Sequence, residues 1–323
     1  MAAVQSRRRG PVPTGGIIQP KIFGLPIDRE VLFSNHKNIY KKSIEKRQRK
    51  LFLKLPFLKN FLEPGETIFL ATTGYSPVTR LQKLLIGWFF IHLKRSLYVF
   101  TNQRIFHIPT NPSYRYRHTI AEIPYGNCQA MEVKGNGLVI EYAGSGVKEK
   151  FGGLAGKERR KVREIIKKVP PVQLAQNKQS GSGRAHLCPR CAGQLNSGQT
   201  VCEACKLKFK NKTAATLLAL IFPGGGYFYT RRYLLGVLTF LLELGLAAVI
   251  YISLIDVMEG MAERLFWLVP TALALGIEKT VAIAHAWELV SEYIPRTRKF
   301  TPVPRMNRRR KLEAVEAEAA PAL

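Results

Sequence analysis

The stretch Tyr233–Ile255, YLLGVLTFLLELGLAAVIYISLI, decides the architecture of this chain. Its 23 residues contain one charge, Glu243. A helix of this length is about 35 Å long, enough to cross the hydrocarbon core of a bilayer with some tilt. A second stretch, Leu265–Val290, is apolar in its first half and carries polar groups in its second half, namely Glu278, Lys279, His285 and Glu288. We therefore predict an α-helical membrane region over residues 213–294 with two spans.

A shorter apolar segment, Ala214–Phe222, precedes both spans. Its nine residues are too few to cross a bilayer and are followed by a Pro-Gly-Gly-Gly turn, which favours a re-entrant or hairpin segment. The loop 256–264, DVMEGMAER, is acidic, whereas both flanks of the membrane region are basic, so the positive-inside rule predicts cytoplasmic flanks. A full crossing by residues 214–229 would place Arg231 and Arg232 on the opposite side, which also favours the hairpin.

The residues 222–236, FPGGGYFYTRRYLLG, resemble small bacterial membrane families that share a Pro-Gly-x-Gly-x-x-Tyr turn, a basic step and a glycine. The matching positions here are Pro223, Gly224, Gly226, Tyr229, Arg231, Arg232 and Gly236. Most of these families have no known activity, so the resemblance implies a topology more than a function. Glycines at such positions let two helices approach closely.

Among the ionisable side chains inside the predicted membrane region, Glu243, Glu278 and His285 are the candidates for function. Such residues are rare in membranes, and each carries a functional hypothesis. Glu278 and His285 are seven residues apart and share a helix face, which suits a proton- or ion-handling pair. The alternative is polar contact between helices or a position near the interface, and the pattern leaves both open.

Four of the five cysteines form two C-x-x-C pairs, Cys188/Cys191 and Cys202/Cys205, separated by ten residues. Each pair aims two thiolates at one point, and two pairs complete the closed tetrahedral set of structural zinc. Residues 186–210 therefore resemble a short zinc ribbon, with zinc as the cofactor and no open catalytic position. Ribbons often carry glycine after the second cysteine of each pair, where this chain has Ala192 and Lys206. A redox pair, and His186 as a substitute ligand, are the weaker readings.

Residues 63–169 are expected to form a compact domain of about seven short strands and a closing helix. Turn signals separate many of the expected strands, which are Thr67–Tyr75, Leu97–Phe100, Arg104–Ile108, Ile120–Ile123, Ala130–Val133, Leu138–Tyr142 and Val147–Phe151. The helix follows from an apolar stripe at Val162, Ile165, Ile166 and Val169. The segments LEPGETIFL and LYVFTNQRIFHI are similar to a bacterial pleckstrin-homology-like domain. That resemblance implies binding of lipid or protein without catalysis.

Basic segments surround this domain. Residues 1–62 are basic and partly helical in expectation, and they either lie on a membrane surface or dock on the next domain. The stretch Arg80–Arg95 has the composition of an interfacial anchor, at Trp88, Phe89, Phe90, Lys94 and Arg95, with a buried core segment as the alternative. Residues 170–185 are expected to be a linker, and 295–323 a basic, then Ala/Glu-rich tail.

The charge balance restricts the partners. The chain has 323 residues and a formal net charge of +28, so an anionic neighbour is expected: lipid headgroups, nucleic acid or an acidic protein. The N-terminus has a basic cluster but no following apolar run, which is typical of a cytoplasmic start. The lone Cys128 is expected to be a buried thiol. No phosphate-binding, metalloprotease or nucleophile-elbow motif occurs, so we expect no enzyme and no small-molecule substrate.

These features together predict an α+β multidomain protein of the bacterial inner (cytoplasmic) membrane, with the N-terminal domain, ribbon and tail in the cytoplasm. The expected function is a non-catalytic adaptor or accessory subunit that docks a membrane protein complex. Two alternatives remain: a lipid-binding or lipid-transfer component, and membrane-tethered nucleic-acid binding. The ribbon between Cys188 and Cys205 carries one base and one acid, which disfavours nucleic acid.

Overall fold

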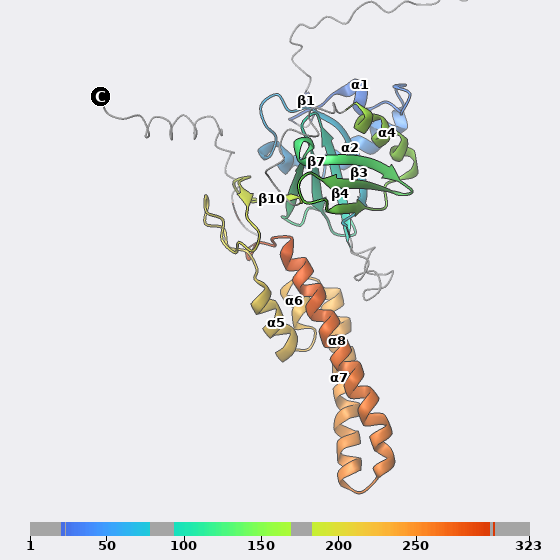
Figure 1. The fold of residues 1–323 in the computed structure, drawn as a ribbon, viewed down its shortest axis with the longest axis vertical. Helices are drawn as coiled ribbons and strands as arrows, with labels where there is room; N and C mark the ends of the chain where they lie inside the picture. The colour runs from blue at the N-terminus through green and yellow to red at the C-terminus, as the bar shows by residue number, and fades with distance from the viewer. Residues whose placement is uncertain (1–20, 23, 78–93, 169–182, 298–299, 301–323) are drawn as a thin grey trace, which may run out of the picture.

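The computed structural model describes residues 21–22, 24–77, 94–168, 183–297 and 300. In these ranges the chain is α+β, with an antiparallel sheet of six strands, a smaller sheet of three, and a set of helices that extends away from both (Figure 1). Both expected span segments are helical. We call the part that contains the two sheets the α+β body.

The six-stranded sheet has the order β11-β10-β6-β5-β4-β3. Its strands are β3 (Ile68–Tyr75), β4 (Arg95–Thr101), β5 (Arg104–Pro109), β6 (Ile120–Pro124), β10 (Ala185–Leu187) and β11 (Gln194–Leu195). In β4, Leu97 and Val99 pack on one face while Tyr98 and Phe100 pack on the other. Both faces are therefore covered, which explains why this strand reads as a continuous apolar run.

The three-stranded sheet covers one of these faces. It consists of β7 (Cys128–Lys134), β8 (Gly137–Tyr142) and β9 (Lys148–Phe151), and α4 (Gly156–Lys167) follows it. Val162 and Ile165 of α4 are buried in the core between the two sheets, as the apolar stripe predicted. The seven expected strands correspond to β3 through β9.

The N-terminal segment covers the other face. It contains the two-residue strands β1 (Lys21–Ile22) and β2 (Leu25–Pro26), the helices α1 (Arg29–Leu32) and α2 (Lys42–Phe52), and the 3-10 turn η1 (Pro56–Asn60). The Gln48 side-chain amide donates to the Ala71 carbonyl over 2.8 Å and accepts from the Ala71 N–H over 3.2 Å. Edge strands need such cover. Of the two expectations for this segment, docking on the next domain is the one observed.

The two segments that carry the resemblance to pleckstrin-homology-like domains are joined by a buried ion cluster. The Arg104 guanidinium pairs with Glu66 at 2.7 Å, with Glu63 at 3.1 Å and with Glu122. Burial alone would lower the pKa of Arg104, and the three carboxylates more than reverse that and raise it. The cluster ties the turn before β3 to the β4–β5 hairpin and to β6.

Two helices, α7 (Tyr233–Met258) and α8 (Leu265–Ser291), are long and apolar enough to cross a membrane. Little of either is buried, and large apolar side chains are exposed along α7 from Leu234 to Met258 and along α8 from Leu265 to Ile277. Figure 1 shows them as an antiparallel pair that projects away from the two sheets; the 3-10 turn η4 (Ala262–Arg264) lies between them. We call this pair the apolar hairpin.

Two short helices, α5 (Lys212–Ile221) and α6 (Gly225–Tyr229), pack at the base of the apolar hairpin. The Asn211 N–H, just before α5, donates to the Tyr229 hydroxyl at the end of α6, so the chain runs out along α5 and returns. This is the hairpin form of the short apolar segment. The turn requires glycine, because a Cβ on Gly224, whose φ is +66°, would lie 2.3 Å from the Gly236 carbonyl oxygen.

Candidate metal centre

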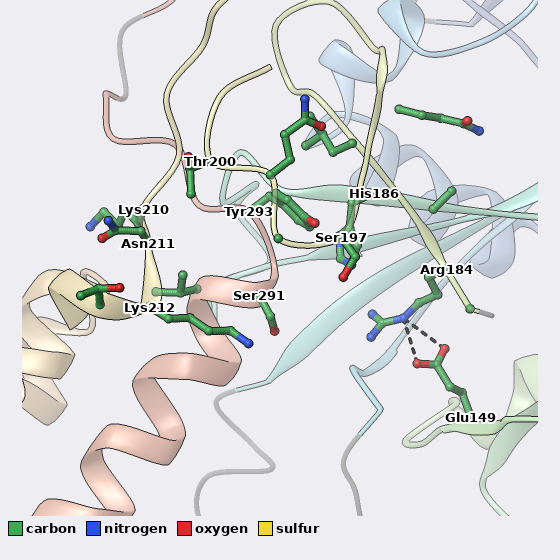
Figure 2. Close-up of a pocket in the computed structure, with 18 of the residues that line it drawn as sticks. Glu149, Arg184, His186, Ser197, Thr200, Lys210, Asn211, Lys212, Ser291 and Tyr293 are labelled. Atoms are coloured by element: carbon green, nitrogen blue, oxygen red, sulfur yellow. Dashed lines mark hydrogen bonds and ion pairs between the residues drawn. The ribbon is translucent and has the colours of Figure 1, made fainter. Parts of the chain in front are cut away.

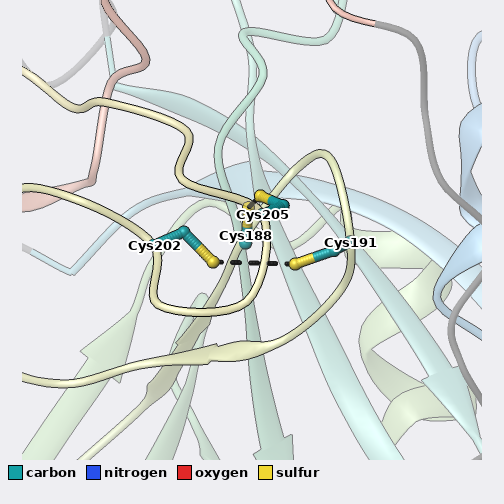
Figure 3. Close-up of side chains that lie close together, drawn as sticks. All are labelled: Cys188, Cys191, Cys202 and Cys205. Atoms are coloured by element: carbon teal, nitrogen blue, oxygen red, sulfur yellow. Dashed lines mark hydrogen bonds between the residues drawn. The ribbon is translucent and has the colours of Figure 1, made fainter.

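The four cysteine sulfurs converge on one point in the ribbon (Figure 3). All four Sγ atoms lie within 4.8 Å of one another, with 3.4 Å between Cys188 and Cys205 and 3.6 Å between Cys191 and Cys202. Zinc–thiolate bonds of about 2.3 Å in a tetrahedron give sulfur–sulfur distances of about 3.8 Å. The donor set therefore fits one metal ion.

The backbone around the two cysteine pairs is built to one pattern. In the first pair the Cys188 N–H donates to the Gly193 carbonyl and the Ala192 N–H donates to Cys188. In the second pair the Cys202 N–H donates to Leu207 and the Lys206 N–H donates to Cys202. Ala192 and Lys206 adopt left-handed conformations, with φ of +56° and +58°. The knuckle geometry thus forms without the glycine that these positions favour.

The variants Ala192→Gly and Lys206→Gly are expected to stabilise the ribbon. A non-glycine residue in the left-handed region costs about 1 kcal/mol, and glycine removes that strain. We expect each variant to raise the free energy of unfolding by up to about 1 kcal/mol, partly offset by the backbone entropy of glycine. Thermal unfolding of the zinc-loaded protein measures this. Gly193→Ala, beside the first knuckle, is the control, and equal destabilisation by all three variants would contradict the argument.

The ribbon joins the α+β body to the helices on two sides. On one side β10 continues the large sheet by pairing with β6, with His186 opposite Ala121. On the other side the Lys210 N–H donates to Ile294 and the Arg296 N–H donates to Lys208, just after α8 ends. The Tyr293 ring packs against His186 and Phe209. A metal here would hold together the segment that connects the two halves of the chain.

The end of the expected linker is part of this junction. Arg184 pairs with Glu149 at 3.1 Å, and its guanidinium lies 3.0 Å from His107 Nδ1, which therefore accepts. On its other side His107 Nε2 lies 3.0 Å from the Ser76 hydroxyl. Burial lowers the pKa of His107, and Arg184 lowers it further. The residues 170–182 of the linker lie outside the described residues.

His186 does not belong to the four-sulfur cluster. Burial, with Arg184 nearby, lowers the pKa of His186 to about 3, so the ring is neutral at physiological pH. Cys128 is buried in the core between the sheets, and burial raises the pKa of its thiol to about 12. It is a buried core thiol, as expected.

Glu243 is buried where α5 and α6 meet the apolar hairpin. It pairs with Lys279 of α8 at 2.5 Å and accepts from the Gly224 N–H over 3.2 Å. Lys279 also donates to the Ala219 carbonyl of α5 over 2.7 Å. The Glu243–Lys279 pair therefore fastens the short helices to both long ones. Lys279 is not among the candidate site residues expected from the sequence, although its charge, opposite in sign to that of Glu243 and in the other predicted span, could have indicated this pair.

The other two candidate polar residues, Glu278 and His285, both lie on α8. The His285 Nδ1 lies 2.6 Å from the Tyr227 hydroxyl of α6, which is a polar contact between helices. The prediction of a proton- or ion-handling pair stays a prediction.

The structure describes only two of the five residues of the expected interfacial anchor, Lys94 and Arg95. Trp88, Phe89 and Phe90 lie outside the described residues. Lys94 is buried and pairs with Glu288 of α8. Burial lowers the pKa of Lys94 to about 8. Arg95 begins β4 and donates to the Pro112 carbonyl over 2.9 Å. Lys94 thus acts as a contact between the α+β body and α8, which differs from the exposed anchor expected for it.

Comparison with protein-family models, with curated proteins and with solved structures finds no match to this chain. The class that the geometry itself defines is an α+β protein with a cluster of four cysteines that could hold a metal ion and with two helices of membrane-spanning length.

Proposed function

We propose that this chain is a non-catalytic integral membrane adaptor, anchored by the apolar hairpin, that docks an acidic partner protein complex at the cytoplasmic face. The observation that carries the proposal is the union of an apolar hairpin with an α+β body through a metal ribbon paired to both. A flexible tether would need neither the pairing of the ribbon with β6 nor its pairing with the segment after α8. A protein that holds a binding surface at a fixed distance from the membrane would need both.

The exposed basic surface supports an acidic partner. It lies on α2 and α4, which Figure 1 shows at the end of the α+β body away from the apolar hairpin. Its side chains are Lys41, Lys42, Lys46, Arg49, Lys50, Lys157, Arg160, Arg163, Lys167 and Lys168. An Arg47–Glu158 pair at 3.1 Å joins the two helices. We call this the distal basic surface. Because this surface lies away from the apolar hairpin, an acidic protein is a better binding partner for it than the membrane that holds the hairpin.

A pull-down from native membranes in mild detergent, with nuclease and a moderate-salt wash, tests the proposal. The triple variant Lys42→Gln, Arg160→Gln, Arg163→Gln is compared with a matched control on the small sheet, Lys134→Gln, Lys148→Gln, Lys150→Gln. We expect one membrane protein complex at fixed stoichiometry with the wild type and the control, and at least about tenfold less with the distal variant. Equal recovery with all three proteins would refute docking at this surface.

The same surface favours one second candidate, nucleic acid held near the membrane. Phosphate contacts make such binding fall steeply with salt, by orders of magnitude between about 50 and 200 mM. DNA or RNA binding by the purified chain that follows this slope, and that the distal variant loses, would replace the protein partner. Salt-insensitive or absent binding would exclude nucleic acid.

A further inference from the structure

A cleft of about 750 Å³ lies where the α+β body, the ribbon and the helices meet. Figure 2 shows Arg184 and Glu149 on the body side, Ser197 and Thr200 from the ribbon, Lys212 from the start of α5, and Ser291 with Tyr293 from the end of α8. Three separate parts of the chain therefore form the wall of the cleft. Its lining residues include neither the four cysteines nor any residue of the distal basic surface.

The lining suits an anion with several oxygen acceptors. Three cations line it, Lys210, Lys212 and Arg184, of which Lys210 already donates to the Tyr229 carbonyl of α6. Glu149 is the one carboxylate among the lining residues. Glu149 is already paired with Arg184 at 3.1 Å. Hydroxyls and side-chain amides supply further donors, from Ser197, Thr200, Ser291, Gln194, Gln199 and Asn211. Cations beside neutral donors are the recognition chemistry of phosphate.

The cleft also lies at the level where the apolar surface begins. Within the described residues no carboxylate pairs with Lys212, and its ammonium lies 6.0 Å from the centre of the Trp287 ring. Trp287 is 45% exposed and its indole N–H donates to the Thr216 hydroxyl of α5 over 2.6 Å. Exposed Leu217 follows on α5, about one and a half turns from Lys212. Tryptophan and lysine at such a boundary are typical of headgroup depth.

We propose that this cleft binds the phosphate-bearing headgroup of an anionic glycerophospholipid. The inference rests on the membrane anchoring in the proposed function but not on the partner docked there. Lys212 pairs with the phosphate, and the ribbon hydroxyls hold the polar substituent. A soluble phosphate ester has the same chemistry, so the test must separate the two sources.

The test is calorimetric titration of the full-length, zinc-loaded chain in a neutral detergent. The probes are dioctanoyl phosphatidylglycerol, dioctanoyl phosphatidylcholine, glycerol 3-phosphate and inorganic phosphate. Lys212→Gln removes the unpaired cation, Ser197→Trp narrows the cleft without a change of charge, and Lys208→Gln is the matched control on the ribbon outside the cleft. Loss of one charge-assisted contact weakens binding about tenfold.

We expect the phosphatidylglycerol to bind, with about tenfold weaker affinity in Lys212→Gln and Ser197→Trp, and with unchanged affinity in Lys208→Gln. Binding of glycerol 3-phosphate or inorganic phosphate at equal strength would assign the site to soluble phosphate and overturn the lipid. No binding, or equal loss in Lys208→Gln, would overturn the site. The titration contains no partner, so its failure leaves the docking proposal standing. Recovery of the chain in the soluble fraction after carbonate extraction would instead refute the membrane anchoring.

Discussion

Removal of the metal is expected to separate the α+β body from the helices. The ribbon has a small apolar core of its own, so the free energy of metal binding is largely its free energy of folding, roughly 10 kcal/mol for isolated zinc modules. Cys202→Ser, or chelation, should reduce bound zinc from about one equivalent to well below it. The ribbon pairings with β6 and with Ile294 should then open. Metal analysis and hydrogen exchange at the amides of Leu187 and Lys210 measure the two effects.

The control for this prediction is Cys128→Ser. Cys128 is buried in the core between the two sheets and has no part in the sulfur cluster. Its variant should cost stability without a change in zinc content or in exchange at Lys210. A Cys202→Ser protein that keeps full zinc, or keeps both amides protected after its zinc is gone, would show that the ribbon stands without its metal.

Replacement of Arg104 by methionine is expected to lower the free energy of unfolding by about 3–5 kcal/mol. The variant keeps the volume but leaves Glu66 and Glu122 buried without their cation, and removal of one partner from a buried ion pair is far more costly than loss of the whole pair. Glu66 also accepts from the Thr101 hydroxyl over 2.7 Å, so the β4–β5 turn loses order as well. Chemical denaturation of the zinc-loaded protein gives the value.

Two further variants isolate the cause. Arg115→Met is the matched control, because Arg115 is exposed, and we expect a change within about 0.5 kcal/mol. Arg104→Met combined with Glu66→Gln and Glu122→Gln leaves no stranded charge at these two positions, so we expect it to be more stable than Arg104→Met alone. Equal stability of the two proteins would attribute the loss to packing.

The cleft lies where the α+β body, the ribbon and the helices meet, and the distal basic surface lies at the end of that body away from the apolar hairpin (Figure 1). If both proposals hold, a chain without zinc should keep its apolar hairpin in the membrane. The distal basic surface should then no longer be held at a fixed distance from the membrane. We therefore expect Cys202→Ser to lose capture of the partner while it stays in the membrane fraction after carbonate extraction. The cleft and the distal basic surface would then act together in one membrane-anchored binding protein.

The sequence by itself determined the local elements. Short β-type runs separated by turn signals located the strands from β3 to β9, an apolar stripe located α4, and two long apolar runs located α7 and α8. Two C-x-x-C pairs identified the complete sulfur set. Each of these signals lies within about 25 neighbouring residues, where backbone geometry and side-chain spacing act directly.

The tertiary structure decided what contacts what across long separations. It buried Lys94 against Glu288 and placed Lys279 beside Glu243. It also placed the Gln48 side chain in hydrogen-bonding contact with the backbone of the edge strand β3. It also placed Ala192 and Lys206 in the left-handed region, which their residue types disfavour. No local pattern specifies such contacts, because the partner is chosen by the packing of the whole chain. Only the folded structure shows that the segment with the four cysteines pairs on one side with the α+β body and on the other side with the end of α8.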